Sequence, residues 1–348
     1  MFRLKSKIKI KANSLPLFAA LGIFLLLFLA GSVMYSNFLS LRVILNLLIS
    51  NAHVIVLACG ICFTILTGGI DLSVGAVIAM TSMIAAGLLR AGLPAFAVIL
   101  ICLVVGSLFG TLQGFLIQYF KLHPWIVTLA GMFFARGVCY LIDVKTIPIT
   151  DDTFHAISQF KIYLLPGYFI SLNVLIALVF LLVCVYLSKF TKFGRTIYAM
   201  GGNYQSAVLM GLPVERTKIL VYSFSGFSSS LAGIMFTLYT LSGYGLHAQG
   251  LEMDAIAACV IGGVLLTGGV GSLFGPFIGV LTSGVIRTMV DFQGTLSSWW
   301  TKIFVGTLML ICIVMQVGIV KRGKIKKGSE IIEKAPEEKE EDSKVEVA

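Results

Sequence analysis

Charged residues are scarce in this sequence, and their scarcity excludes an ordinary soluble protein. Only 12% of the 348 residues are charged, whereas 58% are hydrophobic. Soluble domains carry about 25% charged residues, so the composition indicates a polytopic membrane protein. Acidic residues are especially few, and Asp71 is the only one before Ile142. A lone carboxylate between two apolar runs is costly in hydrocarbon and therefore marks a functional element or a membrane boundary.

The sequence also lacks the patterns of catalytic, metal and nucleotide sites. Its four histidines are scattered, and none belongs to a His-Glu-x-x-His pair. No Gly-x-x-x-x-Gly-Lys-Ser/Thr loop is present to cradle phosphates. The seven cysteines lie in apolar runs and are odd in number, which argues against a disulfide framework. We expect a protein that is not an enzyme and binds no cofactor, so that any ATP it uses is hydrolysed by another subunit.

Ten apolar runs can cross a membrane if short or broken spans are included. They predict spans at about 15–34, 52–67, 72–90, 94–118, 124–142, 167–188, 219–241, 253–266, 272–290 and 302–320. Basic clusters at Arg3–Lys11 and Lys321–Lys327 flank the series. By the positive-inside rule, both termini and residues 189–218 are cytoplasmic, and residues 143–166 face the other side. The predicted fold class is all-α, with residues 15–320 as the transmembrane domain.

The two ends of the chain differ from this domain in composition. Residues 1–14 form a basic segment that we assign to the cytoplasm. The last 21 residues hold 8 of the 16 acidic residues and only 3 of the 26 basic ones. Such a segment cannot bury enough apolar surface to fold, so we predict that residues 321–348 are a disordered, charged cytoplasmic tail.

Two internal repeats are visible, and they require different alignments. Gly-Ser-Leu-Phe-Gly-x-x-x-Gly occurs at 106–114 and at 271–279, a shift of 165. Leu-Thr-Gly-Gly occurs at 66–69 and at 266–269, a shift of 200. The first shift would pair spans of opposite direction and give an inverted repeat of spans 2–5 and 7–10, which is common in transporters. We favour this first alignment, and the second stays open.

A glycine-rich stretch surrounds Asp71, and we call residues 67–75 the signature turn. Its key residues are Gly68, Gly69, Asp71, Ser73 and Gly75. The glycines let the backbone leave helical geometry. We predict that the Asp71 carboxylate caps the start of the next span, where free N–H groups and the helix dipole favour an acid. The turn would then serve as a structural or gating element.

The predicted cytoplasmic loop at 189–218, the coupling loop, contains a second local pattern. Asn203 follows two glycines and can cap a short helix that runs to Met210, with Gly211 as its end signal. A short amphipathic helix flanked by basic residues suits docking into a groove of a partner protein. A helix lying on the inner leaflet is the alternative.

At these two segments the sequence resembles the permease subunits of bacterial ABC importers for simple sugars. The likeness covers about residues 15–320. The Gly-Gly-Ile-Asp-Leu-Ser-Val-Gly run at 68–75 is similar to the family's signature, and residues 194–211 are similar to its ATPase-coupling loop. The matching positions in that loop are Gly194, Arg195, Ala199, Gly201, Gly202, Asn203, Ala207 and Gly211. Ser206 departs from the pattern, because the family has an alanine there.

Within the family, the likeness is closest to a permease of a galactofuranose importer. It is carried by the runs at 128–137 and at 294–302. The resemblance implies cytoplasmic ATP-binding subunits, a second permease subunit (identical or sister) and an extracytoplasmic sugar-binding protein as partners. It also implies that the chain lies in the inner membrane and forms a pathway for a monosaccharide. ATP binding would move the coupling loop, and the spans would alternate between outward and inward openings.

A stand-alone ion-coupled carrier or channel that uses Asp71 is the rival hypothesis. Carriers of that kind place carboxylates or histidines within their spans as relays, and few such residues are present here. A selective channel needs a ring of repeated polar residues, which the sequence does not contain.

Overall fold

The computed structural model describes residues 15–297, 299–316 and 318. The predictions for residues 1–14 and 321–348 lie outside this part of the chain. The long helices are α1 (Leu15–Met34), α2 (Leu41–Leu66), α3 (Val74–Arg90), α4 (Ala95–Tyr119), α5 (Pro124–Ile142), α7 (Leu172–Phe190), α10 (Val214–Thr240), α11 (Leu251–Ile261), α12 (Gly275–Gln293) and a final helix, Trp299–Gln316. The short helices are α6 (Asp152–Gln159), α8 (Lys192–Gly202) and α9 (Tyr204–Leu209).

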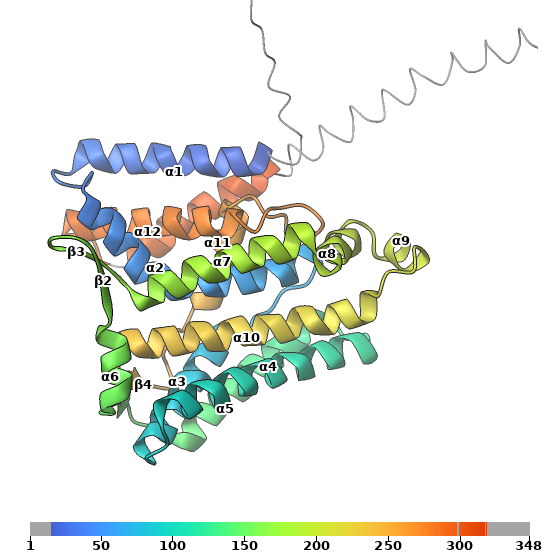
Figure 1. The fold of residues 1–348 in the computed structure, drawn as a ribbon. Helices are drawn as coiled ribbons and strands as arrows, with labels where there is room; N and C mark the ends of the chain where they lie inside the picture. Colours follow the sequence, from blue (N-terminus) through green and yellow to red (C-terminus); the bar gives the residue numbers. More distant parts are fainter. Residues whose placement is uncertain (1–14, 298, 317, 319–348) are drawn as a thin grey trace, which may run out of the picture.

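Two small antiparallel sheets complete the described structure. They pair β1 (Ile147–Pro148) with β4 (Ser242–Gly243), and β2 (Lys161–Leu165) with β3 (Tyr168–Ser171). Figure 1 shows β2, β3, β4 and α6 at one end of the bundle, which we call the β end, and α8 and α9 at the opposite end, the α8–α9 end. The described chain begins in α1 and finishes in the final helix at the α8–α9 end (Figure 1).

Each of the ten predicted spans overlaps one of the long helices, so the all-α polytopic fold is confirmed. Among the described residues, seven helices are long and apolar enough to cross a membrane. The other three are α3, with 17 residues, α11, with 11, and α12. The predicted end of the α11 span, residue 266, is wrong by five residues. α11 ends at Ile261, because Gly262 and Gly263 end the helix within the apolar run. Gly263 has φ +88°, a left-handed conformation that interrupts the helix.

Three other predicted helix starts are also wrong by five residues or more. α10 begins at Val214 instead of residue 219, directly after Pro213. α2 begins at Leu41 instead of residue 52, because the Ser40 hydroxyl accepts a hydrogen bond from the Val43 N–H and caps the helix. α7 begins at Leu172 instead of residue 167. The preceding residues, Tyr168–Ser171, pair with β2 as strand β3, and Gly167 turns the hairpin with φ +83°.

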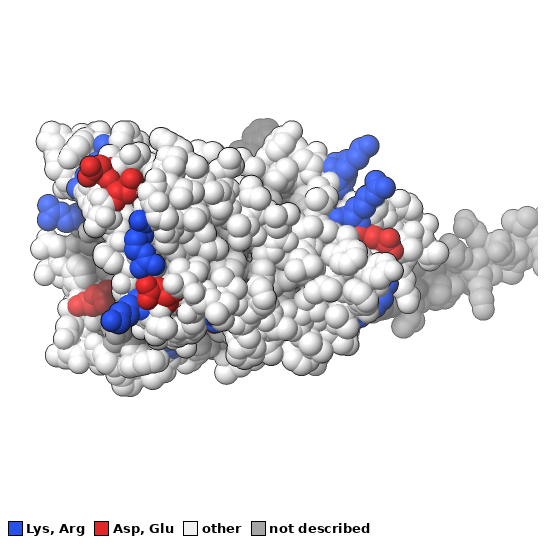
Figure 2. All heavy atoms as spheres, turned by 90° about the horizontal axis from the view of Figure 1, so that it is seen from below, with Lys and Arg blue, Asp and Glu red and all other residues white. Residues whose placement is uncertain are grey.

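On one face of the molecule, charged side chains are concentrated toward the two ends of the bundle. Figure 2 shows one face of the molecule, with acidic and basic side chains toward both ends and a band between them that carries none. A pair of polar ends around an apolar band is the pattern expected of helices that cross a bilayer.

Helix α2 lies at the centre of the bundle. Every residue from Asn51 to Leu66 is buried, and the helix packs against α7, α10, α11 and α12. Beside it, α4 and α10 approach so closely that a Cβ on Gly110 would overlap the Tyr222 carbonyl oxygen. Small residues at helix interfaces permit this kind of close packing in membranes. The glycines of the 106–114 repeat therefore hold α4 against α10.

Candidate functional site

The signature turn connects α2 to α3 within the bundle. Gly68 adopts φ +80°, which glycine reaches without steric cost. The Gly69 N–H then donates to the Thr64 carbonyl oxygen at 3.0 Å, which closes the end of α2. Residues 69–73 have no regular secondary structure before α3 begins at Val74. The turn therefore places Asp71 between two helix ends.

Asp71 is only 1% exposed, and both of its carboxylate oxygens accept hydrogen bonds. Oδ1 accepts from the Ser73 N–H at 2.9 Å and from the Ser73 hydroxyl at 2.7 Å. Oδ2 accepts from the Ser225 hydroxyl of α10 at 2.6 Å. None of the ion pairs in the described residues includes Asp71. The carboxylate thus ties the turn to α10 through neutral donors, which satisfy a buried acid.

The prediction that Asp71 caps α3 is wrong in detail. The N-cap residue of α3 is Ser73, whose side chain makes no capping hydrogen bond. Asp71 lies two residues earlier, and its bond to the Ser73 N–H closes an Asx-type turn. The carboxylate therefore shapes the entry to α3 instead of satisfying the free N–H groups of its first turn.

Sequence reasoning missed the polar side chains that surround this turn. The Ser73 hydroxyl lies 3.3 Å from Oε1 of Gln113 on α4. The hydroxyl of Tyr222 on α10 lies against Gly69, where no Cβ would fit. The one local signal was the serine-rich run at 223–230, which supplies Ser225 to Asp71. Its spacing alone does not reveal which residue it would meet.

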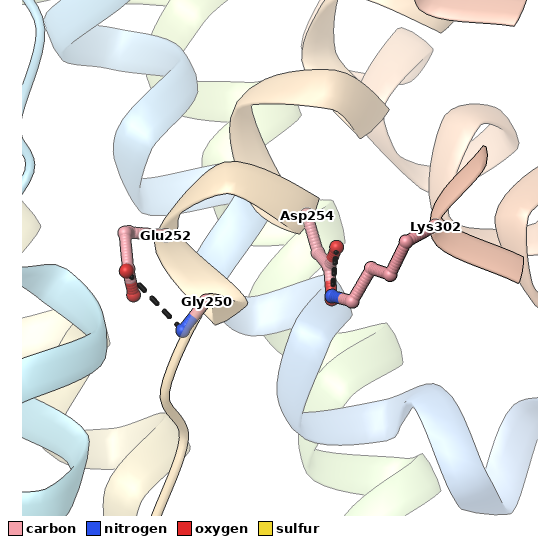
Figure 3. A network of polar contacts seen from close by, with 4 residues as sticks. All are labelled: Gly250, Glu252, Asp254 and Lys302. Carbon is pink, nitrogen blue, oxygen red and sulfur yellow. Dashed lines mark hydrogen bonds and ion pairs between the residues drawn. The ribbon is translucent and has the colours of Figure 1, made fainter. Parts of the chain in front are cut away.

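Glu252 is a further buried acid that contacts the signature turn. It lies in the first turn of α11, and its exposed fraction is 9%. A Cβ on Gly75 would overlap its Oε2 atom, so Gly75 lets α11 approach the start of α3. Oε1 accepts from the Gly250 N–H at 3.2 Å. Figure 3 shows that Glu252 and Asp254 project to opposite sides of the first turn of α11, with Asp254 pointing toward Lys302.

The coupling loop folds into two short helices, as the capping pattern predicts. The Thr191 hydroxyl accepts from the Gly194 N–H at 3.2 Å and caps α8. The Asn203 side chain accepts from the Ser206 N–H at 2.9 Å and caps α9. Gly211 follows α9 with φ +71°. The predicted helix start at Asn203 and the end signal at Gly211 are confirmed.

Small residues in this loop have distinct structural roles. A Cβ on Gly194 would overlap the Ser188 carbonyl oxygen, so glycine lets α8 fold back tightly onto the end of α7. Ala207 is fully buried and packs with Met200 and Val214. Ser206 is exposed. The departure from the family pattern therefore falls on the solvent side, and the buried position keeps its alanine.

Three backbone segments meet at the end of α8, in a contact that we call the loop junction (residues 66–69, 201–202 and 266–271). The Gly269 N–H donates to the Leu66 carbonyl oxygen at 2.9 Å. A Cβ on Gly201 would overlap both Leu66 and Gly269. The Tyr198 hydroxyl of α8 also donates to the Gly271 carbonyl oxygen at 3.0 Å. The end of α8 is therefore in direct contact with the end of α2 and with the loop between α11 and α12.

The loop junction bears on the two internal repeats. The segments matched by the shift of 200, Leu66–Gly69 and Leu266–Gly269, lie against each other. The Cys259 thiol of α11 also donates to the Ala58 carbonyl oxygen of α2 at 3.4 Å, so the helices that precede the two segments are in contact as well. The segments matched by the shift of 165 pack on different helices, α4 on α10 and α12 on α11. The inverted repeat that we favoured stays a prediction.

The outer face of α9 is apolar and exposed. Leu209 is 88% exposed and Met210 is 65% exposed, with Val208 beside them. Arg195 on α8 and Asn203 between the two helices are exposed at the same end of the bundle. A protruding apolar tip on a short capped helix has the form of a docking element for a groove.

Comparisons with known proteins place the chain in a family. The family described as "Branched-chain amino acid transport system / permease component" matches residues 43–313. The chain is 44% identical to the inner membrane ABC transporter permease protein YjfF of Escherichia coli, over 89% of this chain and 94% of that protein. It is 37% identical to the fructose import permease protein FruG of Bifidobacterium longum, over 93% and 96%.

The ribose import permease protein RbsC of Bacillus subtilis is 38% identical, over 85% of this chain and 90% of that protein. No solved structure matches the chain. The family match covers well over half of the chain, and the relatives align along almost their whole length. The chain therefore belongs to this family of membrane permease components of ABC transporters, which take part in transport and carry no ATPase site of their own.

Proposed function

We propose that this chain forms part of the translocation pathway of an ABC importer for a monosaccharide. The loop junction carries the proposal. Because the end of α8 touches both α2 and the loop before α12, a displacement of α8 must move two elements of the bundle. Interiors packed this closely switch between discrete arrangements and do not deform continuously. ATP binding by partner subunits would supply the displacement.

The exposed tip of α9 supports docking of an ATP-binding subunit at the α8–α9 end. Leu209 and Met210 would enter a groove on that subunit and bury apolar area there. In this arrangement α8 and α9 are cytoplasmic. Both termini are then cytoplasmic too, since the described chain begins and finishes at the same end (Figure 1). The β end would face the extracytoplasmic binding protein.

A monosaccharide is the proposed substrate because relatives of this chain are named as import permeases for fructose and for ribose. Galactofuranose is the specific sugar that we propose, on the likeness of residues 128–137 and 294–302 to a galactofuranose permease. The permease would pair with a second copy or with a sister chain. The hydrogen bonds of Asp71 support a structural role for this residue in the importer, since its partners are neutral hydroxyl and N–H groups.

ATP-driven uptake of labelled sugars by the complete importer tests this proposal. We expect uptake of galactofuranose. We expect no uptake of leucine, a branched-chain amino acid chosen because the family description names that class of substrate. Replacing both Gly201 and Gly211 by leucine should abolish uptake, because leucine at 201 collides with Leu66 and Gly269 and leucine at 211 is strained at φ +71°. Normal uptake by a double variant that inserts into the membrane would refute the role of the coupling loop.

A further inference from the structure

A polar cavity of about 620 Å³ opens near the β end, away from the loop junction. It lies between the first half of α2, the last turns of α10, the turn at 244–250, α11 and α12. Its main polar and aromatic lining residues are Ser50, Asn51, His53, Tyr239, His247, Gln249, Asp254, Arg287, Thr288, Asp291 and Lys302. A cavity of this size accepts a small molecule.

The charges around the cavity are balanced. Asp254 accepts from the Lys302 ammonium group at 2.7 Å, and Figure 3 shows the two side chains pointing toward each other. Arg287 and Asp291 lie four residues apart on α12, on one face of that helix. Two acids thus oppose two basic groups, and the cavity has no excess of either sign to favour an anion or a cation. Such a lining suits a neutral polar solute.

Aromatic rings form one wall of the cavity. The ring of His53 lies edge-on to Phe236, with 5.2 Å between centroids, and is stacked with Tyr239 at 6.4 Å. The Tyr239 side chain is 57% exposed. His247 also packs edge-on against Phe236, with 5.2 Å between centroids, and its buried Nδ1 has no hydrogen-bond partner among the described residues. An apolar ring face beside polar side chains matches a molecule with a C–H face and hydroxyl edges.

The wall that carries His247 is held in place by Arg136 of α5. Its Nη1 atom donates to the carbonyl oxygens of Gly245 and His247, each at 2.7 Å. Charge-assisted bonds of this length are strong, so the turn at 244–250 is fixed before any solute arrives. Preorganisation of this kind lowers the entropic cost of binding.

We propose that this cavity is a low-affinity monosaccharide subsite at the extracytoplasmic entrance to the pathway. The proposal rests on the proposed function and deepens it by locating where the sugar first contacts the permease. The ring of Tyr239 would pack against the C–H face of the sugar. The Asn51 Oδ1 and the Thr288 hydroxyl oxygen would accept hydrogen bonds from its hydroxyl groups, because the Asn51 Nδ2 and the Thr288 O–H already donate to the carbonyl oxygens of Leu47 and Gly284.

Cysteine protection tests the subsite in membranes that contain the complete importer. Thr288→Cys places a thiol in the cavity wall, and Ser50→Cys is a second position should the first fail to fold. The seven native cysteines are buried, so background labelling by a membrane-impermeant maleimide is low. Lys145→Cys is the matched control, because it is exposed at the same end and outside the cavity.

We expect extracellular maleimide to label the cavity thiols and free galactofuranose or ribose to slow that labelling. Mass action predicts half the rate when the sugar concentration equals its dissociation constant. Labelling at Lys145→Cys should not change, and mannitol should have no effect as an osmotic control. Three outcomes would overturn the subsite: no labelling from outside, no protection by sugar, or protection only by leucine or by the binding protein without sugar.

The same membranes separate failure of the subsite from failure of the proposed function. Wild-type importer that takes up sugar with ATP, while neither Ser50→Cys nor Thr288→Cys shows protection, refutes the subsite alone. Absence of ATP-driven sugar uptake in the wild type refutes the proposed function itself.

Discussion

Gly201→Ala is the sharpest perturbation of the coupling mechanism. The added Cβ would come within 2.9 Å of the Gly269 Cα, and closer still to the Leu66 carbonyl oxygen. Ordinary van der Waals contact begins at 3.4 Å, so the end of α8 must withdraw by at least about 0.5 Å, the difference between these two distances. Overpacking of a tight contact costs about 1–3 kcal/mol.

That strain acts only on the conformation in which the loop junction is closed. A differential energy of about 1–3 kcal/mol shifts a two-state equilibrium roughly 5–150-fold, so we expect sugar uptake to fall about tenfold or more. ATP hydrolysis should persist, because the variant leaves the exposed tip of α9 unchanged. The assay therefore measures ATP hydrolysed per sugar imported in proteoliposomes that contain the complete importer.

Two matched variants make this test specific. Gly202→Ala changes the next residue of α8, where the added methyl group meets no atom within 4 Å in this chain. Gly22→Ala makes the same change in open space on α1. Both should keep near-normal coupling. Normal coupling in Gly201→Ala would refute the reasoning, and so would an equal loss in Gly202→Ala, since the effect would then not come from the junction contact.

Three further predictions follow from individual contacts. Asp71→Asn should keep most of the uptake, because the amide oxygen can still accept from Ser73 and the amide NH₂ can donate to the Ser225 hydroxyl. Asp71→Leu leaves these buried donors unpaired, at about 1–3 kcal/mol each, and should lower both the yield of folded protein and the uptake. Complete loss of uptake in a normally assembled Asp71→Asn variant would indicate that the charge itself acts. Leu209→Asp should abolish co-purification with the ATP-binding subunit while membrane insertion persists, and retained co-purification would contradict docking through α9. The Lys145 N–H and the Arg90 guanidinium hold the pKa of the Asp143 carboxyl below its usual value, so the stability that Asp143 contributes is lost as the pH falls through this lowered pKa. Asp143→Asn should therefore leave thermal stability nearly unchanged at neutral pH, because the pair is exposed, and should make stability fall less in acid. A large loss of stability at neutral pH would contradict this account.

The parts of the structure that depend on local patterns could be predicted from the sequence. Apolar runs gave all ten helices of the bundle, because each helix needs an apolar surface to lie in the membrane or against its neighbours. The capped helix α9 followed from Asn203 and Gly211, since both signals act within a few residues. Helix ends were less accurate where glycine or a hairpin interrupts an apolar run, as at Gly262 and Tyr168.

The contacts between distant segments could not be predicted. Asp71 and Ser225 are 154 residues apart, and only the packing of α10 beside the signature turn brings them together. Leu66 and Gly269 meet for the same reason, although the Leu-Thr-Gly-Gly repeat had marked both segments. An apolar pattern tells which residues are buried, and many arrangements of the helices satisfy it.

ATP-dependent sugar uptake by the purified system tests the central claim most directly. Vesicles would contain this chain, its permease partner and the ATP-binding subunits, with the binding protein and labelled galactofuranose supplied outside. We predict uptake that stops when ATP or the ATP-binding subunits are omitted. Sugar accumulation by this chain alone, driven by an ion gradient and independent of ATP, would contradict the account.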